Sequence, residues 1–287
     1  MGRRRAFLHI GLPRSGGGFL DAMLLEHAEA LAEVGVTAPA TQADEMFRAA
    51  IEIRRDHRAW GYPRKAVEGT WAQLCRRAQK GHGDVVVSQE LLATCTRPQI
   101  DLLLDTLTGF EVHVVITVRE PRGPDLGEVA ARWSAAVAGP QRVHVLVAPA
   151  AGDPREAIWR GLGELVGFDP TRMPLSDPRL PEHLVRSLAR AVDGPPASDD
   201  ELLDRADRWR KALAEGGYDV RGDSADLLPG AGARALTHAE RLEVATDVLA
   251  TLVVEVGALR EDNQVLAKRG EKLERKRAKL KRRLGGD

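Results

Sequence analysis

The chain has 287 residues, of which 43% are hydrophobic and 29% are charged, and its formal net charge at pH 7 is zero. This length allows one large domain or one domain with an appendage, and the composition is that of a globular protein. Because no segment approaches about 18 consecutive apolar residues, we expect no transmembrane helix.

The charge is distributed unevenly along the chain. From Lys268 to Asp287, ten Lys or Arg stand against three acidic residues, which gives this tail a charge of +7 and leaves −7 on the body before it. Cys75 and Cys95 have neither CxxC spacing nor companion histidines, so the sequence predicts no zinc site and no disulfide framework. Two isolated thiols fit a reducing cytoplasm, where we expect the protein to be located.

The first predicted element is a strand over Ala6–Ile10, which is followed by the stretch GLPRSGGGF and then by a helix. The apolar positions of this helix are Phe19, Met23, Leu24, His27 and Leu31. A strand, a glycine-rich turn and a helix bring free backbone N–H groups and the positive end of a helix dipole to one place, where they can bind an anion.

Each residue of the turn has a role in this hypothesis. Gly16, Gly17 and Gly18 let the backbone approach a ligand, Ser15 can donate a hydroxyl hydrogen bond, and Arg14 can bind two phosphate oxygens at once. The turn is not a Walker A loop, because Gly16 is followed by two glycines instead of Lys and Ser or Thr, so we do not expect hydrolysis of a nucleoside triphosphate. A glycine-rich turn without a ligand is the alternative.

The stretch EIRRDHRAWGYPRKAVEGTW, residues 52–71, combines basic residues with aromatic ones. Trp60, Tyr62 and Trp71 could line a groove for an acceptor molecule or stack on sugars. The alternative is a solvated helix and loop whose tryptophans anchor it to the core.

Three further strands are predicted from runs of Val and Ile, namely Asp84–Ser88, Glu111–Val118 and Val143–Val147. A helix between the first two carries Ile100, Leu103, Leu104 and Leu107 on one face. Strands that alternate with helices predict crossover connections and a parallel sheet. Beyond Pro149 we expect only helices, over 154–166, 181–192 and 199–216.

Glu90 comes just past the carboxyl end of the strand DVVVS, on the edge where open parallel sheets bind ligands. It is our candidate for a general base, and the alternative is a first-turn helix glutamate that favours the helix dipole. We interpret the histidines in or near strands as structural. They are His9, His82, His113 and His144.

The last fifty residues follow a heptad pattern with leucine at every seventh position. These leucines are Leu252, Leu259, Leu266, Leu273 and Leu280. Asn263 at an a position favours a parallel pair of helices, so we expect a coiled-coil helix over 237–284 that forms a homodimer through 245–284. The alternative is a single helix folded back on the body. Basic residues follow the leucine repeat instead of preceding it, so we expect no sequence-specific DNA binding, although the tail could bind another anionic partner.

Taken together, the turn and the later strands resemble the sulfotransferase family. GLPRSGGGF is similar to the loop with which these enzymes bind the 5′-phosphosulfate of 3′-phosphoadenosine-5′-phosphosulfate (PAPS), and its motif positions fall on residues 13–19. HVVITVREP is similar to the strand that ends in an arginine bound to the 3′-phosphate, which implies that role for Arg119. GDVVVSQELL and GYDVRGDSADLLP also look like segments of such proteins, and the resemblance covers about residues 4–230.

This chain departs from the family pattern at three kinds of position. Arg14 replaces the lysine of the loop, and it can neutralise charge on the leaving group but cannot give up a proton. Gly17 and Gly18 replace two threonines, and Gly127 falls where the family has a further serine that contacts phosphate. Each hydrogen bond to a charged group that is lost in this way is worth about 1.5–3 kcal/mol.

The sequence therefore predicts a P-loop-like three-layer α/β domain over residues 1–230, with a central parallel sheet, and a C-terminal coiled-coil helix. The resemblance implies an enzyme that transfers a sulfuryl group from PAPS to a hydroxyl or amine, without a metal. Arg14 and Glu90 would be catalytic, and the nucleotide would be held by Arg14, Ser15, Gly16, Gly17, Gly18 and Arg119. The alternative is a catalytically impaired relative that serves as a binding or assembly module.

Overall fold

The computed structural model describes residues 3–12, 15, 17–121, 123–150, 153–176, 199–228, 269 and 272–277. The chain divides into two compact units. The first comprises Met1–Asp177 and Ala197–Ala233, and the second comprises Pro178–Pro196 and Arg234–Asp287. Everything said below about the sheet, its helices and the candidate site concerns the first unit.

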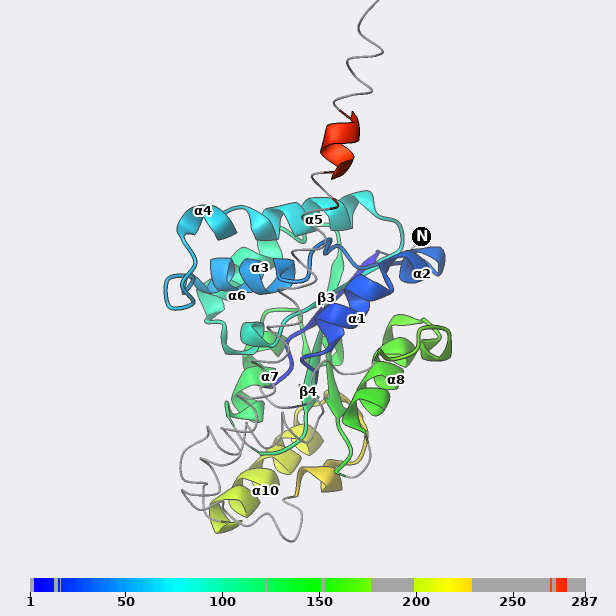
Figure 1. Cartoon of the computed structure of the whole chain (residues 1–287). Helices are drawn as coiled ribbons and strands as arrows, with labels where there is room; N and C mark the ends of the chain where they lie inside the picture. Colours follow the sequence, from blue (N-terminus) through cyan, green and yellow to red (C-terminus); the bar gives the residue numbers. More distant parts are fainter. Residues whose placement is uncertain are drawn as a thin grey trace, which may run out of the picture. The chain divides into compact units, whose positions relative to one another are not determined.

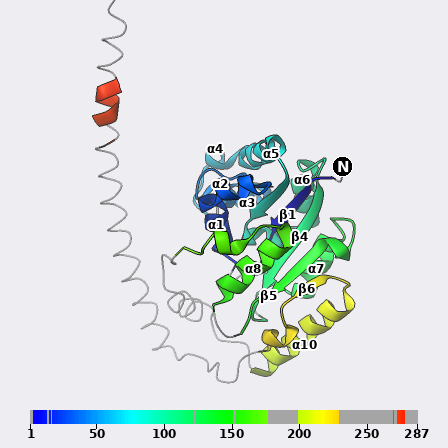
Figure 2. The ribbon, with the colours of Figure 1, turned by 90° about the vertical axis from the view of Figure 1, so that its right-hand side faces the viewer.

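The first unit is built on a central sheet with helices packed around it (Figures 1 and 2). The sheet is parallel, and its strands have the order β2-β3-β1-β4-β5-β6. The strands are β1 Arg5–His9, β2 Val36–Thr37, β3 Asp84–Ser88, β4 Glu111–Val118, β5 Val143–Val147 and β6 Asp219–Arg221. The predicted bounds of β3, β4 and β5 are confirmed, and β1 lies one residue earlier than predicted. The expectation of no strand beyond Pro149 is wrong, because β6 pairs with β5 at the edge of the sheet.

Helices cover both faces of the sheet, so the predicted three-layer α/β architecture is confirmed. The α-helices are α1 Leu20–Glu26, α2 Ala28–Glu33, α3 Glu45–Arg54, α4 Arg64–Val67, α5 Thr70–Lys80, α6 Arg97–Asp105, α7 Leu126–Ser134, α8 Pro154–Val166 and α10 Asp199–Glu215. The short 3-10 helices are η1 Glu90–Thr94, η2 Pro140–Arg142, η3 Pro170–Arg172 and η4 Ser224–Leu227.

Several helices begin where the sequence supplies a cap. At α7, Asp125 accepts a hydrogen bond from the backbone N–H of Glu128, and at α8, Asp153 accepts one from the N–H of Arg155. At α6, Thr96 and Gln99 form a capping box. A side chain that satisfies a free N–H at a helix start contributes about 1 kcal/mol, which fixes where each helix leaves its strand.

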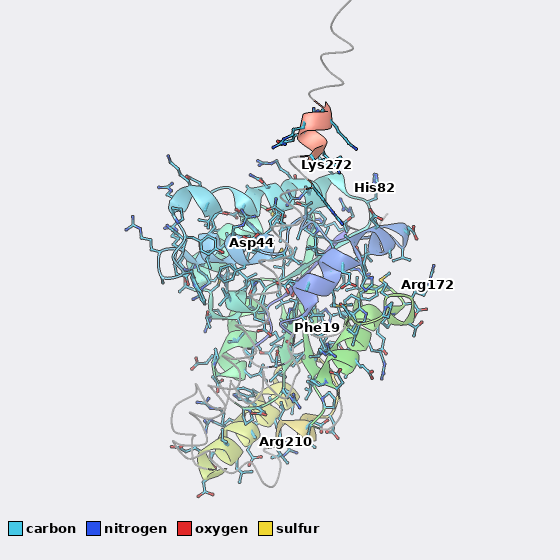
Figure 3. The ribbon with its side chains drawn as sticks, in the orientation of Figure 1. Phe19, Asp44, His82, Arg172, Arg210 and Lys272 are labelled. Carbon is cyan, nitrogen blue, oxygen red and sulfur yellow. The ribbon has the colours of Figure 1, made fainter. Side chains whose placement is uncertain are left out.

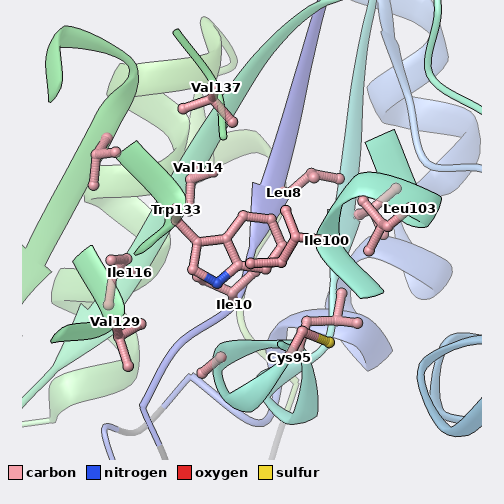
Figure 4. Close-up of a cluster of buried hydrophobic side chains, with 14 of the residues drawn as sticks. Leu8, Ile10, Cys95, Ile100, Leu103, Val114, Ile116, Val129, Trp133 and Val137 are labelled. Carbon is pink, nitrogen blue, oxygen red and sulfur yellow. The ribbon is translucent and has the colours of Figure 1, made fainter. Parts of the chain in front are cut away.

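Alternating side chains of the central strands contribute to two separate hydrophobic cores. Leu8, Ile10 and Val114 pack with α3, α5, α6, α7 and α10 on one face, where Trp133 is completely buried (Figure 4). On the other face, Phe7 and Val115 pack with α1, α2 and α8. Because each strand is buried on both faces, its sequence is a continuous apolar run, which is why β3, β4 and β5 could be predicted.

Little of the predicted coiled coil belongs to the described part of the chain. Residues 272–277 are helical, and Leu273 among them is 65% exposed. The rest of the predicted helix 237–284, most of the pairing region 245–284 and the predicted helix 181–192 lie outside the described residues. In the described ranges, no helix is both long enough and apolar enough to cross a bilayer.

Candidate functional site

The direction in which the chain adds strands to the sheet reverses at β1, in the middle of the sheet. From β1 the chain passes to β2 and β3 on one side, and from β3 it crosses to β4, β5 and β6 on the other side. Accordingly, α1, which follows β1, packs on one face of the sheet, and α6, which follows β3, packs on the opposite face. In open α/β sheets, ligands bind beside such a reversal at the carboxyl ends of the strands.

The glycine-rich turn lies at this carboxyl edge. Leu12 extends the pairing of β1, because its N–H donates to the carbonyl of Thr117, and the N–H of Ser15 donates to the carbonyl of Leu12. Phe19 stands at the start of α1 without a side-chain cap (Figure 3). Pro13, Arg14 and Gly16, and with them the predicted roles of Arg14 and Gly16, lie outside the described residues.

Glu90 begins η1, directly after β3, and its carboxyl group reaches the turn. The N–H of Gln89 donates to the carbonyl of His9, which ties the end of β3 to the end of β1. The hydroxyl of Ser15 donates to Oε1 of Glu90 over 3.4 Å, whereas Oε2 would lie 3.6 Å from a Cβ atom placed on Gly18. Both oxygens of the carboxyl group therefore face the turn.

The carboxyl group of Glu90 is placed for proton transfer near neutral pH. Burial raises the pKa of Glu90 to about 7, although the hydroxyl of Ser15 and the backbone amide of Gly17 stabilise its ionised form. The charge of Asp21, on the first turn of α1, raises it further, and burial also raises the pKa of Asp21 itself. A carboxyl group with such a pKa can both accept and release a proton at pH 7.

Arg119 follows β4 directly, so it lies at the same edge of the sheet as the turn and Glu90. The residue is 9% exposed and has an interaction partner. Gly127, where the family pattern has a serine that contacts phosphate, lies in the first turn of α7. A Cβ atom there would be 3.2 Å from Cβ of Ala212 in α10, so this glycine allows the two helices to pack closely.

Behind the turn lies a group of buried polar side chains that was not predicted as part of the site. His9 at the end of β1 is 0% exposed, and its Nδ1 and Nε2 lie 2.8 Å from the hydroxyl of Ser88 and 2.9 Å from that of Thr117. Oγ1 of Thr117 is in turn 2.6 Å from Oγ of Ser15. His9 is structural, as predicted, in the sense that burial lowers its pKa to about 3 and keeps it neutral.

These polar side chains also explain two of the glycines. A Cβ atom on Gly11 would overlap Oγ1 of Thr117 and would lie 2.6 Å from Nε2 of His9. A Cβ atom on Gly17 would lie 2.6 Å from Oγ1 of Thr117 and 2.8 Å from the imidazole of His9. Positions 11 and 17 thus require glycine, because any side chain there would overlap His9 and Thr117. A Cβ atom on Gly18 would make only ordinary van der Waals contacts.

The structure thus brings together Ser15, Gly17, Gly18 and Glu90, and places Arg119 at the end of a neighbouring strand. Sequence reasoning missed Ser88 and Thr117, and it did not connect His9 with the turn. A signal was present, since each of these residues is a polar residue near the end of an otherwise apolar strand. Such residues lie side by side once the strands are aligned.

The basic and aromatic stretch 52–71 forms a pocket of about 580 Å³ on the same unit. Its lining residues are Glu52, Arg55, His57, Arg58, Arg64, Val67, Glu68 and Leu102. Trp60, Tyr62 and Trp71 are not among these lining residues, and core anchoring holds for one of the two tryptophans. Trp71 is buried in the core, whereas Trp60 is 47% exposed and contacts Phe47 edge-on.

Among the described residues, no three His, Cys, Asp or Glu side chains are grouped so that they could hold a metal ion. The residues at the carboxyl edge are donors and acceptors of hydrogen bonds together with an arginine, which are the groups that bind oxyanions. No protein-family profile matches this chain, and no curated protein matches it either.

Proposed function

We propose that the first unit binds an adenosine phosphosulfate of the PAPS type at the carboxyl edge of its sheet and transfers the sulfuryl group to a hydroxyl or amine. The observation that carries this proposal is the position of Glu90, whose carboxyl group lies against Ser15 and Gly18 in the turn. A base and a candidate phosphosulfate-binding turn in contact are what an in-line transfer needs, because the acceptor must lose a proton close to the transferred group.

The hydrogen bonds of the turn support separate roles for the carboxyl group of Glu90 and for the backbone N–H groups. Oε1 of Glu90 accepts from Ser15, and the backbone amide of Gly17 also stabilises the carboxylate, so the carboxyl group is held in the turn and would take the proton of an acceptor with a remaining lone pair. In the described part of the turn, the backbone N–H groups of Gly18 and Phe19 have no hydrogen-bond partner, so they could donate to a sulfate or phosphate oxygen. Arg14 and Arg119 would supply the positive charge that the departing nucleotide needs.

The pocket formed by the stretch 52–71 favours an acceptor that carries negative charge. Glu52 accepts from the N–H of Trp71 and Glu68 pairs with Arg64, so both acids of the pocket are engaged. Arg55 and Arg58 contact no carboxylate among the described residues. The neighbouring Arg54 donates to the carbonyl of Leu91, which holds this end of α3 beside the segment that begins with Glu90.

Binding of 3′,5′-adenosine bisphosphate is the direct test of the nucleotide site. We expect millimolar nucleotide to raise the melting temperature of the wild-type protein, Arg119→Ala to abolish the rise, and the exposed Arg76→Ala to leave it intact. Transfer of labelled sulfate from PAPS should then require Glu90, so that Glu90→Gln binds nucleotide but transfers at least about a hundredfold more slowly. No melting shift in the wild-type protein would contradict the proposal.

A second candidate function is a binding or assembly module without catalysis. It is favoured by Ser15, which is 1% exposed and whose hydroxyl lies against Thr117, and by the absence of hydroxyls at Gly17 and Gly18. This candidate predicts a melting shift without sulfuryl transfer, and self-association through the heptad leucines. Light scattering should then give a dimer for the full chain and a monomer for a chain that ends at residue 236.

A further inference from the structure

A continuous chain of hydrogen bonds runs from the interior of the sheet to Glu90. It connects Ser88 to His9 over 2.8 Å, His9 to Thr117 over 2.9 Å, Thr117 to Ser15 over 2.6 Å, and Ser15 to Glu90 over 3.4 Å. The four inner side chains are at most 2% exposed. The direction of each hydrogen bond is therefore constrained by its neighbours in the chain.

Counting protons limits the chain to two arrangements. A hydroxyl has one proton and two lone pairs, so a serine or threonine that uses its proton within the chain donates to one neighbour and accepts from the other. The neutral imidazole of His9 likewise has one donor nitrogen and one acceptor nitrogen. If all four hydrogen bonds form at once and the hydroxyls of Thr117 and Ser15 both donate within the chain, the bonds all point toward Glu90 or all point away from it.

The state of Glu90 selects between these arrangements. An ionised carboxylate can only accept, so Ser15 must donate to it, Thr117 must donate to Ser15, and His9 must carry its proton on Nε2. A protonated Glu90 can instead donate to Ser15, and the reversed chain places the proton of His9 on Nδ1, where it donates to Ser88. The two arrangements differ in composition only by the one proton that Glu90 binds.

We infer that the tautomer of His9 is coupled to the proton on Glu90, with the Nε2–H form accompanying the ionised carboxylate and the Nδ1–H form gaining population when Glu90 is protonated. His9 is then a positioning residue, since it acts on Glu90 only through Thr117 and Ser15. In the ionised state the chain aims the Ser15 hydroxyl at Oε1 and so stabilises the carboxylate. The coupling is a property of the folded protein, and its use in sulfuryl transfer rests on the proposed function.

Among the described residues, charged and polar groups act on the two titratable members of the chain, Glu90 and His9. Glu90 is influenced by the carboxyl group of Asp21 on α1, by Ser15 and by the amide of Gly17. Around His9, the contacting groups are the hydroxyls of Ser88 and Thr117, so no charged side chain competes for its two nitrogens. Asp21 therefore provides a control, because it acts on Glu90 without touching the chain.

Nitrogen NMR of the protein with labelled histidine tests the inference, because Nδ1 and Nε2 of a neutral imidazole differ in shift according to which one carries the proton. The carboxyl carbon of Glu90 is followed in parallel from pH 5 to 9. At pH 9 we expect the Nε2–H tautomer of His9 to outnumber the Nδ1–H tautomer by more than tenfold. As the pH falls, the population of the Nδ1–H tautomer should rise with the same midpoint as the protonation of Glu90. A predominant Nδ1–H form at pH 9, or a constant tautomer while Glu90 titrates, would overturn the inference.

Three variants separate coupling from a merely structural role. In Ser15→Ala the chain is interrupted with little loss of volume, so the His9 tautomer should no longer depend on pH, and the midpoint of Glu90 should rise. In Glu90→Gln the tautomer should likewise be independent of pH. In Asp21→Asn the midpoint of Glu90 should fall, and the midpoint of the His9 tautomer should fall with it; a tautomer midpoint that stays in place would contradict the coupling. None of these measurements requires nucleotide binding, so their failure and that of the proposed function are distinguishable.

Discussion

The same face of the sheet carries polar side chains at both of its ends, and the two groups are built differently. At the carboxyl end, His9 lies between the hydroxyls of Ser88 and Thr117. At the amino end, His113 and His144 are linked to each other over 2.9 Å, and the outer nitrogen of each contacts a carboxylate. We refer to these as the hydroxyl row and the carboxylate row.

The carboxylate row has fewer N–H protons than its hydrogen bonds need, whereas the hydroxyl row has enough protons for its own. Its three contacts join Glu111 to His113 over 3.1 Å, His113 to His144, and His144 to Asp219 over 2.7 Å. Two neutral imidazoles supply only two of the three protons that these hydrogen bonds need. The row is complete only after it binds one further proton, whereas the hydroxyl row is complete with neutral His9.

This difference shows that the partners of a histidine decide what it can do. Burial lowers the pKa of both His113 and His144, but hydrogen bonds to Glu111 and Asp219 oppose this effect. In the hydroxyl row nothing opposes burial, and the pKa of His9 falls to about 3. The carboxylate row can therefore respond to mild acid, whereas the hydroxyl row keeps His9 uncharged and can only redirect its hydrogen bonds.

The largest expected effect is on stability in acid. The pKa of His9 falls from 6.5 in the unfolded chain to about 3 in the folded protein, so between these values only the unfolded chain binds this proton. His9 therefore costs stability as pH falls, by about 4 kcal/mol at pH 3 relative to pH 7. Glu90 acts with the opposite sign from pH 7 down to 4.5, because its folded pKa is raised.

Comparison with His9→Gln isolates this contribution, since both proteins retain Glu90. Denaturant unfolding at several pH values should show the difference in unfolding free energy between wild type and His9→Gln changing by several kcal/mol from pH 6.5 to 3. The same comparison with His144→Gln should give a much smaller change. Equal changes for the two variants would remove the distinction between the rows.

A second effect concerns the two adjacent glycines of the turn. Gly17→Ala would press a methyl group against His9 and Thr117, so we expect the unfolding free energy to fall by about 1–3 kcal/mol. Gly18→Ala has only contacts of 3.6 Å and longer with Glu90, so its effect should stay below about 0.5 kcal/mol. Thermal unfolding of the two variants gives the comparison, and a turn whose glycines served only a ligand would give equal effects.

The smallest effect concerns the carboxylate row. His113 and His144 should titrate in two separate steps, because a second proton would place two N–H groups and two positive charges face to face. Asp219 raises the pKa of His144, so Asp219→Asn should move the first step to lower pH by less than about one unit, since this carboxylate is partly exposed. Histidine NMR measures both steps; a single step shared by both rings would show that the row does not act as a pair.

The sequence predicted the strands that are buried on both faces of the sheet, but it did not predict the strands at the edges of the sheet. Continuous runs of Val and Ile made β3, β4 and β5 predictable, because no polar residue interrupts a strand between two helical layers. The edge strands β2 and β6 have only two and three residues, and each is partly exposed, so neither shows a period. Local pattern could not have revealed them.

The candidate site was predictable to the same extent. The end of a strand and the turn after β1 could be expected to meet, and Ser15 does lie beside Glu90. The connection through His9 depends on register, since His9 is aligned with Ser88 on β3 and with Val115 on β4, two residues before Thr117. Register between strands more than seventy residues apart is set by the whole sheet, and no single stretch of sequence contains it.

The central place of β1 has a consequence for synthesis of the protein on the ribosome. β1 is the earliest strand of the sheet, yet its two neighbours, β3 and β4, end at Ser88 and Val118. Until residue 118 has left the exit tunnel, β1 is an apolar strand with at least one unpaired edge, because β4 cannot yet pair with it. Such edges pair readily with other chains. We expect nascent chains shorter than this to need chaperone protection, and longer ones to be released from it as β4 closes against β1.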